Sequence, residues 1–162
     1  MSQATVKMPL AEAKALAEEL LIILKEKGIS KVEITGSVLR EEKYIGDIDI
    51  ICNGQIEEVA KQLGPIQSGN IEGSQRVILT YKGKLVNLFR TTEEEWGAMR
   101  FYLTGPKNYV IAYRLRAKKM NFKLNQHGLF DATGKCVASR TEEEIYKALD
   151  KTWKPPQMRG KK

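Results

Sequence analysis

Apolar residues recur at helical intervals through residues 9–27, where they form one stripe on an otherwise charged segment. Proline suits the first turn of a helix and glycine the position just past its end, and Pro9 and Gly28 stand at those places. The pattern predicts an amphipathic helix that packs one face on a core. The stripe comprises Leu16, Leu20, Ile23 and Leu24.

β-Branched runs further along the chain predict a sheet. Residues 31–35 and 48–52 are two such runs, and residues 76–81 and 85–89 form a hairpin pattern that turns at a Lys-Gly pair. Helical patterns and shorter strand patterns lie between and after these runs. The remaining predicted helices are residues 56–63, 108–119 and 141–149, and the remaining predicted strands are residues 121–123 and 127–130.

Positive charge is concentrated in the last third of the chain. The formal net charge is +7 over 162 residues, and residues 98–124 contain no acidic residue. Clustered cations repel unless a polyanion lies among them, so the pattern indicates either a phosphate-binding surface or a solvated basic face. The charge change predicts a boundary between residues 1–97 and residues 98–162. The clustered cations are Arg100, Lys107, Arg114, Arg116, Lys118, Lys119 and Lys123, with a second run at Lys151, Lys154, Arg159, Lys161 and Lys162.

Composition excludes several classes of protein. No apolar run approaches the ~20 residues that span a membrane, and acidic residues interrupt the N-terminal segment where a signal peptide would be apolar. The two cysteines, Cys52 and Cys136, give neither a disulfide framework nor a zinc spacing. We therefore expect an intracellular, soluble protein of the cytoplasm or nucleus, with no membrane partner.

The segment Gly46-Asp47-Ile48-Asp49-Ile50 carries the clearest chemical signal. Residues two apart on a strand share a face, so Asp47 and Asp49 project their carboxylates together while the isoleucines point to the core. Two neighbouring carboxylates repel each other unless cations lie between them, and Mg²⁺ prefers such oxygen ligands. The arrangement suits two-metal phosphoryl transfer, although most acidic pairs of this kind lie at ordinary strand edges or caps.

A second signal lies upstream. Gly36 and Ser37 follow the first predicted strand, where backbone N–H groups and a hydroxyl can bind phosphate, and Arg40 lies one helical turn on. Alone, this pattern indicates an ordinary strand-to-helix turn that needs its glycine. Followed by Gly-Asp-x-Asp, it is the arrangement of a nucleotidyltransferase.

Residues 36–49 resemble the palm motif of family X DNA polymerases, the group that contains DNA polymerase beta. Tyr102-Leu103-Thr104-Gly105 is similar to the family's Tyr-Phe-Thr-Gly element, and residues 124–130 and the Lys154-Pro155 tail match in order. The likeness covers roughly residues 30–158 and is strongest to the small viral members. It implies a palm sheet that holds metals and a lobe that closes over the nascent base pair.

The resemblance implies a role for each matching residue. Asp47 and Asp49 would be catalytic and would bind two Mg²⁺ ions, for which Mn²⁺ can substitute. The nucleotide would contact Gly36, Ser37, Arg40, Gly46, Tyr102, Leu103 and Gly105. DNA would contact Lys107, Arg114, Arg116, Lys118, Lys119, Lys123 and Gln126. The implied partners are a dNTP and gapped or primer–template duplex DNA, with the chain acting as a monomer.

Three residues depart from the pattern of the best-known members. Leu103 replaces Phe, Val110 replaces an Asn that contacts the minor-groove edge of the incoming base, and Lys107 replaces an acidic residue. Loss of a minor-groove contact predicts low fidelity. The family also has a cis peptide after the glycine of the Tyr-x-Thr-Gly element. Because the next residue here is Pro106, for which the cis form is inexpensive, we expect a cis Gly105–Pro106 bond.

The third catalytic position of the family falls on Asn87, in the run Val86-Asn87-Leu88-Phe89. A neutral amide is a poor metal ligand and cannot serve as a base. Either the natural protein has lost its strongest activity, or Asn87 is a substitution introduced to trap substrates. The surrounding pattern still fits a metal-site strand, which favours the second explanation. In both cases we expect a weakened variant.

We therefore expect an α+β or α/β fold in two parts: a nucleotidyltransferase palm, a mixed sheet with flanking helices, in residues 1–97, and a small basic α+β lobe in residues 98–162. The reaction would be attack of a primer 3′ hydroxyl on the α-phosphorus of a dNTP, in gap-filling repair synthesis. The rival interpretation is a non-catalytic DNA-binding protein on a degenerate polymerase fold. Transfer of a nucleotide to RNA or a small molecule is disfavoured by the likeness of the C-terminal lobe.

Overall fold

The computed structural model describes residues 7–67 and 76–161. The chain forms two compact units, Met1–Thr91 and Thr92–Lys162. The division precedes the boundary expected at residue 97, because the charge change marks where the basic residues begin and not where the chain leaves the first core. No helix in the described ranges is long and apolar enough to cross a membrane.

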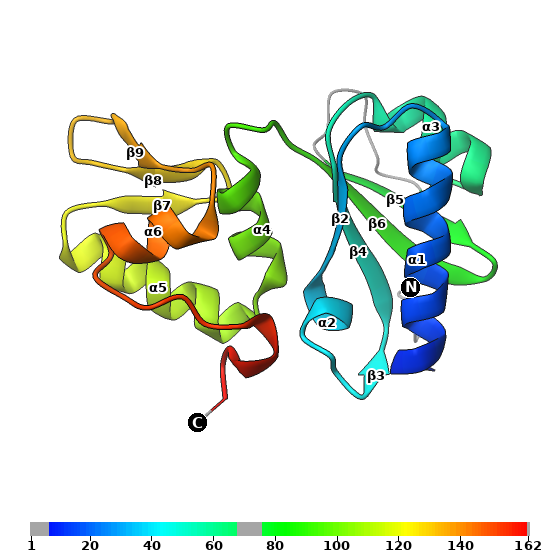
Figure 1. Cartoon of the computed structure of the whole chain (residues 1–162), viewed down its shortest axis with the longest axis horizontal. Helices are drawn as coiled ribbons and strands as arrows, with labels where there is room; N and C mark the ends of the chain where they lie inside the picture. Colours follow the sequence, from blue (N-terminus) through cyan, green and yellow to red (C-terminus); the bar gives the residue numbers. More distant parts are fainter. Residues whose placement is uncertain (1–6, 68–75, 162) are drawn as a thin grey trace. The chain divides into compact units, whose positions relative to one another are not determined.

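The first unit contains a four-stranded mixed sheet in the order β2-β4-β6-β5 (Figure 1). Strands β4 and β6 are parallel, whereas β2 pairs with β4 and β5 with β6 in antiparallel fashion. A short antiparallel pair of β1 with β3 lies outside this sheet. The elements are β1 (Met8–Pro9), α1 (Leu10–Glu26), β2 (Val32–Thr35), α2 (Gly36–Leu39), β3 (Tyr44–Ile45), β4 (Asp47–Cys52), α3 (Ile56–Leu63), β5 (Arg76–Tyr81) and β6 (Lys84–Arg90).

One face of this sheet packs against α1 and α3. Ile48 and Ile50 of β4 and Val86 and Leu88 of β6 are fully buried in the core that these helices cover. Cys52 belongs to the same core. Since side chains alternate along a strand, residues 47, 49 and 87 fall on the other face of the sheet.

Helix α1 buries a different stripe from the one predicted. Ile23 was expected in the core but is only partly buried. Small side chains allow a helix to approach a sheet closely, and the fully buried positions therefore include two alanines. The buried residues of α1 are Ala13, Ala17, Leu20 and Leu24.

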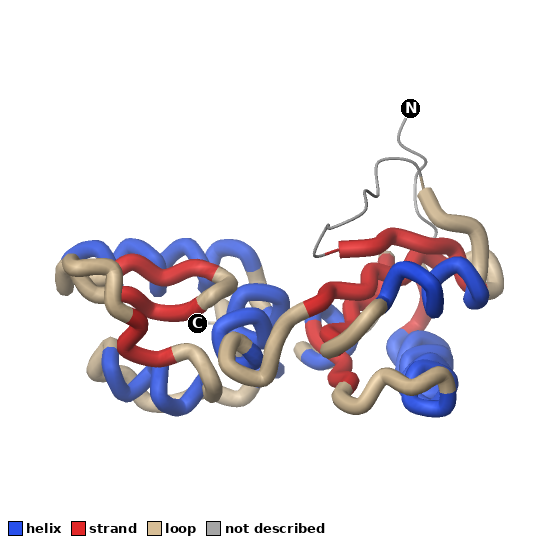
Figure 2. Tube along the Cα trace, turned by 90° about the horizontal axis from the view of Figure 1, so that it is seen from above, coloured by secondary structure: helices blue, strands red, loops and turns tan. Residues whose placement is uncertain are grey.

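The second unit combines helices with a three-stranded antiparallel sheet in the order β7-β8-β9. Figure 2, with strands in red and helices in blue, shows helices flanking these strands. The elements are α4 (Trp96–Thr104), α5 (Lys107–Lys119), β7 (Lys123–Asn125), β8 (Gly128–Phe130), β9 (Cys136–Ala138), α6 (Glu142–Ala148) and a 3₁₀ turn, Pro156–Met158.

Helix α4 was not predicted, because most of its residues are buried and no polar face interrupts the apolar run. The last helix, in contrast, was predicted from the sequence. Helix α6 begins directly after Thr141, the first residue of the predicted range. The backbone N–H of Glu144 donates to Thr141 Oγ1 at 3.2 Å, and the Thr141 N–H donates back to Glu144 Oε1 at 3.2 Å. This capping box satisfies two backbone groups at the start of the helix.

A buried ion pair ties the C-terminal tail to the second unit. Arg159 donates to Glu142 through Nη1 at 2.8 Å and Nη2 at 2.9 Å, and its side chain is fully buried. Arg100 donates to the same carboxylate, as does Trp153 Nε1 at 3.0 Å. Burial would raise the pKa of Glu142, but the hydrogen bonds and charge of Arg159, with Arg100, hold that pKa below its ordinary value. Arg159 therefore does not belong to the basic surface run in which the sequence placed it.

Aromatic rings surround the Arg159 guanidinium. Its central carbon lies 5.4 to 6.0 Å from four ring centroids, within the range of cation–π attraction. These rings belong to Phe101, Tyr109, Tyr146 and Trp153. Tyr109 and Trp153 thus pack in the core of this unit, and Trp96 is also buried.

Candidate active site

Two acids and one amide converge on the face of the first sheet opposite the core of α1 and α3. Asp49 and Asn87 are direct neighbours in the parallel pairing of β4 with β6. The Nδ2 group of Asn87 donates to Asp49 Oδ1 at 2.8 Å and to Asp47 Oδ2 at 3.0 Å. Asn87 is only 8% exposed, so this amide bridges the two carboxylates in a largely dry position.

The surroundings of Asp49 disfavour the charged form of its carboxylate. Burial, followed by the neighbouring charge of Asp47, raises the pKa of Asp49 to about 7. The hydrogen bond from Asn87 and the positive charges of Arg40 and Arg76 act in the opposite direction without cancelling the effect. A site of this kind favours the arrival of a further cation.

The donor set fits a hard divalent cation held by Asp47 and Asp49. Both carboxylates present an oxygen to the same small donor group, so a cation in that region would meet two anionic ligands. Within residues 7–67 and 76–161, no cluster of three or more His, Cys, Asp or Glu side chains could hold a metal. The site therefore contains two carboxylates, and the amide of Asn87 donates to both.

Gly36 lies against the acid pair. Thr35 is aligned with Asp49, and its Oγ1 donates to the Asp49 carbonyl at 3.2 Å. The next residue, Gly36, has a φ of +67°, and a Cβ added there would collide with Asp49 Oδ2. A glycine is therefore required both by the backbone angle and by the close approach of the carboxylate.

Gly46 has no comparable requirement inside the fold. An added Cβ would meet its nearest described neighbour, Lys7 Cγ, only at 4.0 Å, which is ordinary contact. Packing of the chain thus leaves room for a side chain at this position, immediately before Asp47.

Two arginines of the first unit, Arg40 and Arg76, place positive charge near Asp49. Arg40 directly follows α2, the single helical turn that contains Ser37, and its Nε lies 3.6 Å from Glu42 Oε2.

Arg76 was not among the site residues expected from the sequence. It lies on β5 two residues before Ile78, the partner of Asn87, and strand alternation therefore assigns it to the same face. Strand alternation could have predicted this position of Arg76 from the sequence, but only if the pairing of β5 with β6 had been known.

The residues of the second unit that were expected to contact the nucleotide lie at the end of α4. Tyr102 is 41% exposed and Leu103 is partly buried. Gly105 ends the helix with a φ of +61°, and the Gly105–Pro106 peptide is cis, as predicted. Val110, which stands where the resemblance placed a minor-groove contact, is instead buried among the core residues of this unit.

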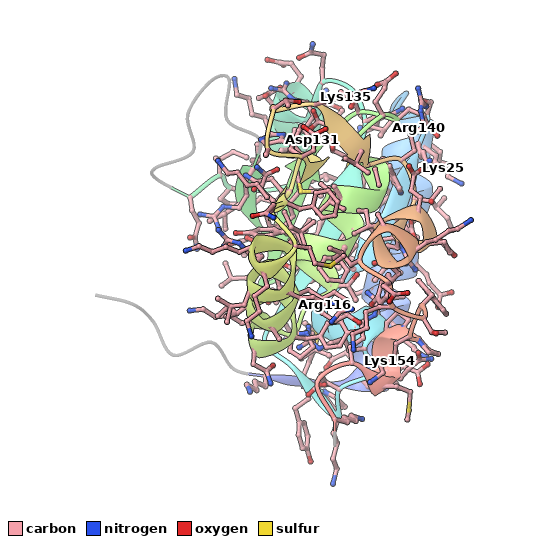
Figure 3. All side chains as sticks on the ribbon, turned by 90° about the vertical axis from the view of Figure 1, so that its left-hand side faces the viewer. Lys25, Arg116, Asp131, Lys135, Arg140 and Lys154 are labelled. Atoms are coloured by element: carbon pink, nitrogen blue, oxygen red, sulfur yellow. The ribbon has the colours of Figure 1, made fainter. Side chains whose placement is uncertain are left out.

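The residues expected to contact DNA divide into two groups. Arg116, labelled in Figure 3, is partly buried and donates through Nε to the Leu149 carbonyl at 2.6 Å and through Nη2 to the Asp150 carbonyl at 3.4 Å. Its guanidinium holds the end of α6 and is therefore not free to contact DNA, contrary to the expectation from the sequence. Gln126 is partly buried between β7 and β8. The exposed members of the set are Lys107, Arg114, Lys118, Lys119 and Lys123.

Paired acids beside a glycine turn on a mixed sheet, followed by a basic α+β unit, have the features of a nucleotidyltransferase. Residues 99–160 match the family described as DNA polymerase beta thumb. The chain is 32% identical over 154 residues to the Repair DNA polymerase X of two African swine fever virus isolates, which covers 86% of this chain and 85% of each relative. The chain therefore belongs to the family X DNA polymerases.

A bacterial relative matches over a larger share of this chain but is much longer. The DNA polymerase/3′-5′ exonuclease PolX of Bacillus subtilis is 28% identical over 164 residues, which covers 94% of this chain and 28% of that protein. Both lines of similarity extend across the two units described above.

Proposed function

We propose that this chain is a DNA-directed DNA polymerase that adds dNTPs to a primer 3′ hydroxyl, in gap-filling repair synthesis of low fidelity, and that Asn87 weakens it. Family membership supports the reaction class. The repair role rests on the names of the viral relatives, and the low fidelity rests on Val110, which has no group to hydrogen-bond a base edge.

The bridging amide of Asn87 is the observation that carries the proposal. Asn87 occupies the place beside Asp49 where a third acid would complete the site, and it donates to both remaining carboxylates. An amide nitrogen cannot accept the proton of an attacking hydroxyl. The geometry therefore supports a site built for acid chemistry and deprived of one acid.

In the proposed mechanism Asp47 and Asp49 would hold two Mg²⁺ ions, for which Mn²⁺ can substitute. Such ions, when bound, neutralise phosphate charge and polarise the reacting oxygens. Gly36 keeps Asp49 in place, while Ser37, Arg40 and Gly46 bind the triphosphate. Arg40 and Arg76 add positive charge to the same face of the sheet.

The second unit would bind the sugar and the DNA. Tyr102, Leu103 and Gly105 would lie beside the incoming sugar. The DNA backbone would contact exposed cations, which release counterions on binding and make affinity depend on salt. These contacts are assigned to Lys107, Arg114, Lys118, Lys119 and Lys123, with Gln126 toward the template.

A non-catalytic DNA-binding protein on a degenerate polymerase fold is the alternative, and the same amide favours it. The hydrogen bonds from Asn87 to both acids stabilise the pair of carboxylates in place of a metal ion. A genomic Asn at this position would support the alternative, whereas a genomic Asp would support a substitution introduced to trap substrates.

Single-turnover primer extension with Mg²⁺ tests the proposal on this chain, on Asn87→Asp, and on Asn87→Asp combined with Asp49→Ala. Loss of a positioned base costs about 10²–10⁴ in rate, so we expect slow extension by the parent chain, recovery in Asn87→Asp and loss again in the double variant. Extension by the parent chain as fast as by Asn87→Asp would show that position 87 is not the third catalytic position. No extension by any of them, with DNA binding intact, would favour the alternative.

A further inference from the structure

The C-terminal tail packs on Pro106, the residue that follows Gly105 at the end of α4. Gly160 of the tail has a φ of +77°, and a Cβ added there would lie only 2.6 Å from Pro106 Cγ. Cβ atoms in proteins do not approach a neighbour so closely, so any residue other than glycine would displace one of the two segments. The tail backbone therefore lies directly against the element that the proposed function assigns to the sugar of the incoming nucleotide.

Of the two segments in this contact, the tail is the more firmly anchored. Arg159, directly before Gly160, is fully buried and donates to Glu142 at 2.8 and 2.9 Å. Its Nε also donates to a backbone carbonyl of the tail at 2.8 Å. Pro106 Cγ belongs to a ring that includes the backbone nitrogen, so this atom cannot move away without its backbone. A side chain at position 160 would therefore displace Pro106 and, with it, Gly105.

We propose that Gly160 is a positioning residue for nucleotide binding, which acts by letting the tail backbone support Pro106. This support keeps Gly105 where it contacts the sugar. The proposal rests on the proposed function and deepens it, because Gly160 itself does not touch the nucleotide. The triphosphate is assigned to Ser37, Arg40 and Gly46 of the first unit, so a change in the tail should affect contacts to the sugar and not contacts to the phosphates.

The test compares two ligands of the same chain by titration calorimetry. Mg²⁺–dATP presents a sugar, a base and three phosphates, whereas Mg²⁺–tripolyphosphate presents the phosphates alone. The ratio of their dissociation constants therefore reports contacts to the nucleoside. In Gly160→Ala we expect dATP to bind about tenfold more weakly, as for one misplaced methyl group in a pocket, with tripolyphosphate binding unchanged.

Gly134→Ala is the matched control. Gly134 belongs to the same unit and has a φ of +89°, but an added Cβ would have no described neighbour within 4 Å. This variant therefore introduces the same kind of backbone strain without the collision, and it should leave the ratio of dissociation constants unchanged.

Gly160→Asn provides a second variant in case Gly160→Ala folds poorly. Asparagine adopts a positive φ more readily than alanine, but it has the same Cβ. We expect the same change in the ratio as in Gly160→Ala, with a smaller loss of stability in thermal unfolding. A role in stability alone would change the unfolding temperature and leave the ratio unaltered.

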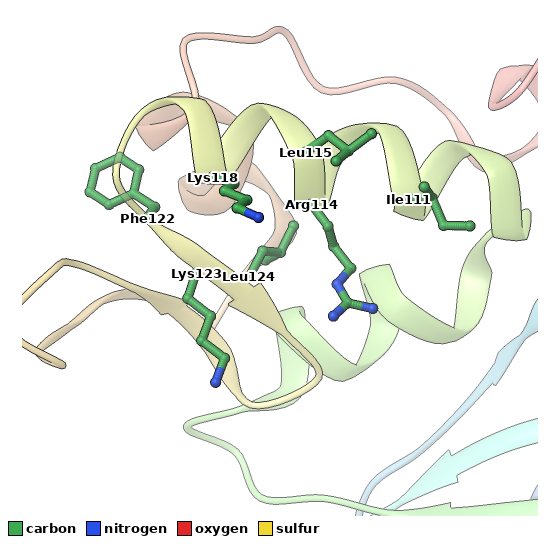
Figure 4. A pocket seen from close by; sticks show the side chains of 7 residues that line it. All are labelled: Ile111, Arg114, Leu115, Lys118, Phe122, Lys123 and Leu124. Carbon is green, nitrogen blue, oxygen red and sulfur yellow. The ribbon is translucent and has the colours of Figure 1, made fainter.

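DNA affinity checks that α5, which follows Pro106, stays in place. The groove between α5 and β7 is lined by residues such as Arg114 and Lys118, and the tail contributes none of its lining residues (Figure 4). Gly160→Ala should therefore leave the affinity for a gapped duplex unchanged. Weaker binding of DNA, dATP and tripolyphosphate alike would indicate a general disturbance of the fold and would overturn the proposal.

The remaining outcomes separate this proposal from the proposed function. If Gly160→Ala and Gly160→Asn show the same ratio as Gly134→Ala, while the parent chain binds dATP, only the positioning role of Gly160 is wrong. If the parent chain binds neither ligand in the presence of Mg²⁺, the proposed function is wrong and the positioning role is wrong with it.

Discussion

Asn87 donates a hydrogen bond of 2.8 Å from Nδ2 to Oδ1 of Asp49, its direct neighbour on the adjacent parallel strand. The two residues are 38 positions apart in the chain, and their alignment is set by the register of β4 with β6. The neutral amide in this place donates hydrogen bonds to two acids that would otherwise repel each other. We therefore expect the amide to stabilise the metal-free fold and to leave the site with one metal ligand and one base fewer than a third carboxylate would give.

Asn87→Asp should therefore destabilise the chain when no metal is present. The substitution removes two hydrogen bonds to charged acceptors and adds a third carboxylate, at a cost of about 2 kcal/mol in the free energy of unfolding. Mg²⁺ should restore most of this loss in Asn87→Asp and stabilise the parent chain less. Scanning calorimetry with and without Mg²⁺ measures both effects.

Asn53→Asp is the control for this substitution. Asn53 Oδ1 only accepts hydrogen bonds, from Ser30 Oγ at 3.1 Å and the Lys31 N–H at 2.9 Å, and a carboxylate can accept both. It should show no comparable Mg²⁺ dependence. Identical responses of the two variants to Mg²⁺ would contradict the role given to position 87.

Gly36→Ala and Gly46→Ala should differ in their effect on stability. At Gly36 the new methyl group meets Asp49 Oδ2 and the backbone has a positive φ, so we expect a loss of stability of about 1–3 kcal/mol together with weaker Mg²⁺–dNTP binding. At Gly46 there is room for the methyl group, so stability should change little while nucleotide binding weakens. Thermal unfolding and titration calorimetry separate the two outcomes, and tight Mg²⁺–dNTP binding by Gly36→Ala would be inconsistent with Asp49 as a ligand.

Glu142→Gln should destabilise the second unit strongly, because it leaves the buried Arg159 without its counter-charge. Breaking a buried ion pair on one side costs about 3–5 kcal/mol. Trp96 and Trp153 both lie in the second unit, so tryptophan fluorescence during denaturant unfolding reports on this unit. Glu143→Gln is the control, since Glu143 is an exposed residue of the same helix.

The effect of Glu142 should also depend on pH. Its pKa in the folded chain lies below the ordinary value of 4.5, so the unfolded chain binds the proton first as the pH falls. The stabilisation is therefore fully present above pH 4.5 and is lost as the pH falls from there through the folded-state pKa. The difference between parent chain and Glu142→Gln should shrink over that interval, and a difference that grows on acidification would contradict the ion pair.

Lys118→Ala/Lys119→Ala should flatten the dependence of DNA affinity on salt. Each phosphate contact contributes about −0.9 to the slope of log affinity against log salt concentration. Arg116→Ala should instead lower stability and leave the slope nearly unchanged, because its guanidinium is bonded to the end of α6. Anisotropy titrations over a range of salt concentrations give the slopes. An unchanged slope in the double lysine variant would assign these charges to a solvated face.

Local patterns predicted several elements correctly. The alternation around Asp47 and Asp49 placed both acids on one face of a strand, and Thr141 marked the start of α6. The cis Gly105–Pro106 peptide, which the family resemblance implied and which proline makes inexpensive, is also present. These features depend on residues that are close in the chain, whose spacing and backbone preferences are written in the sequence itself.

Tertiary structure decided which polar groups meet. The sequence located Asn87 but not the two carboxylates to which its amide donates, and it counted Arg159 among surface cations although Glu142 holds it in the interior. Arg116 and Arg76 were likewise assigned only once their neighbours were known. Such pairs join residues far apart in the chain, so they depend on strand register and on packing. A charge pattern along the sequence carries neither, and the same arginine can face solvent, phosphate or a buried carboxylate.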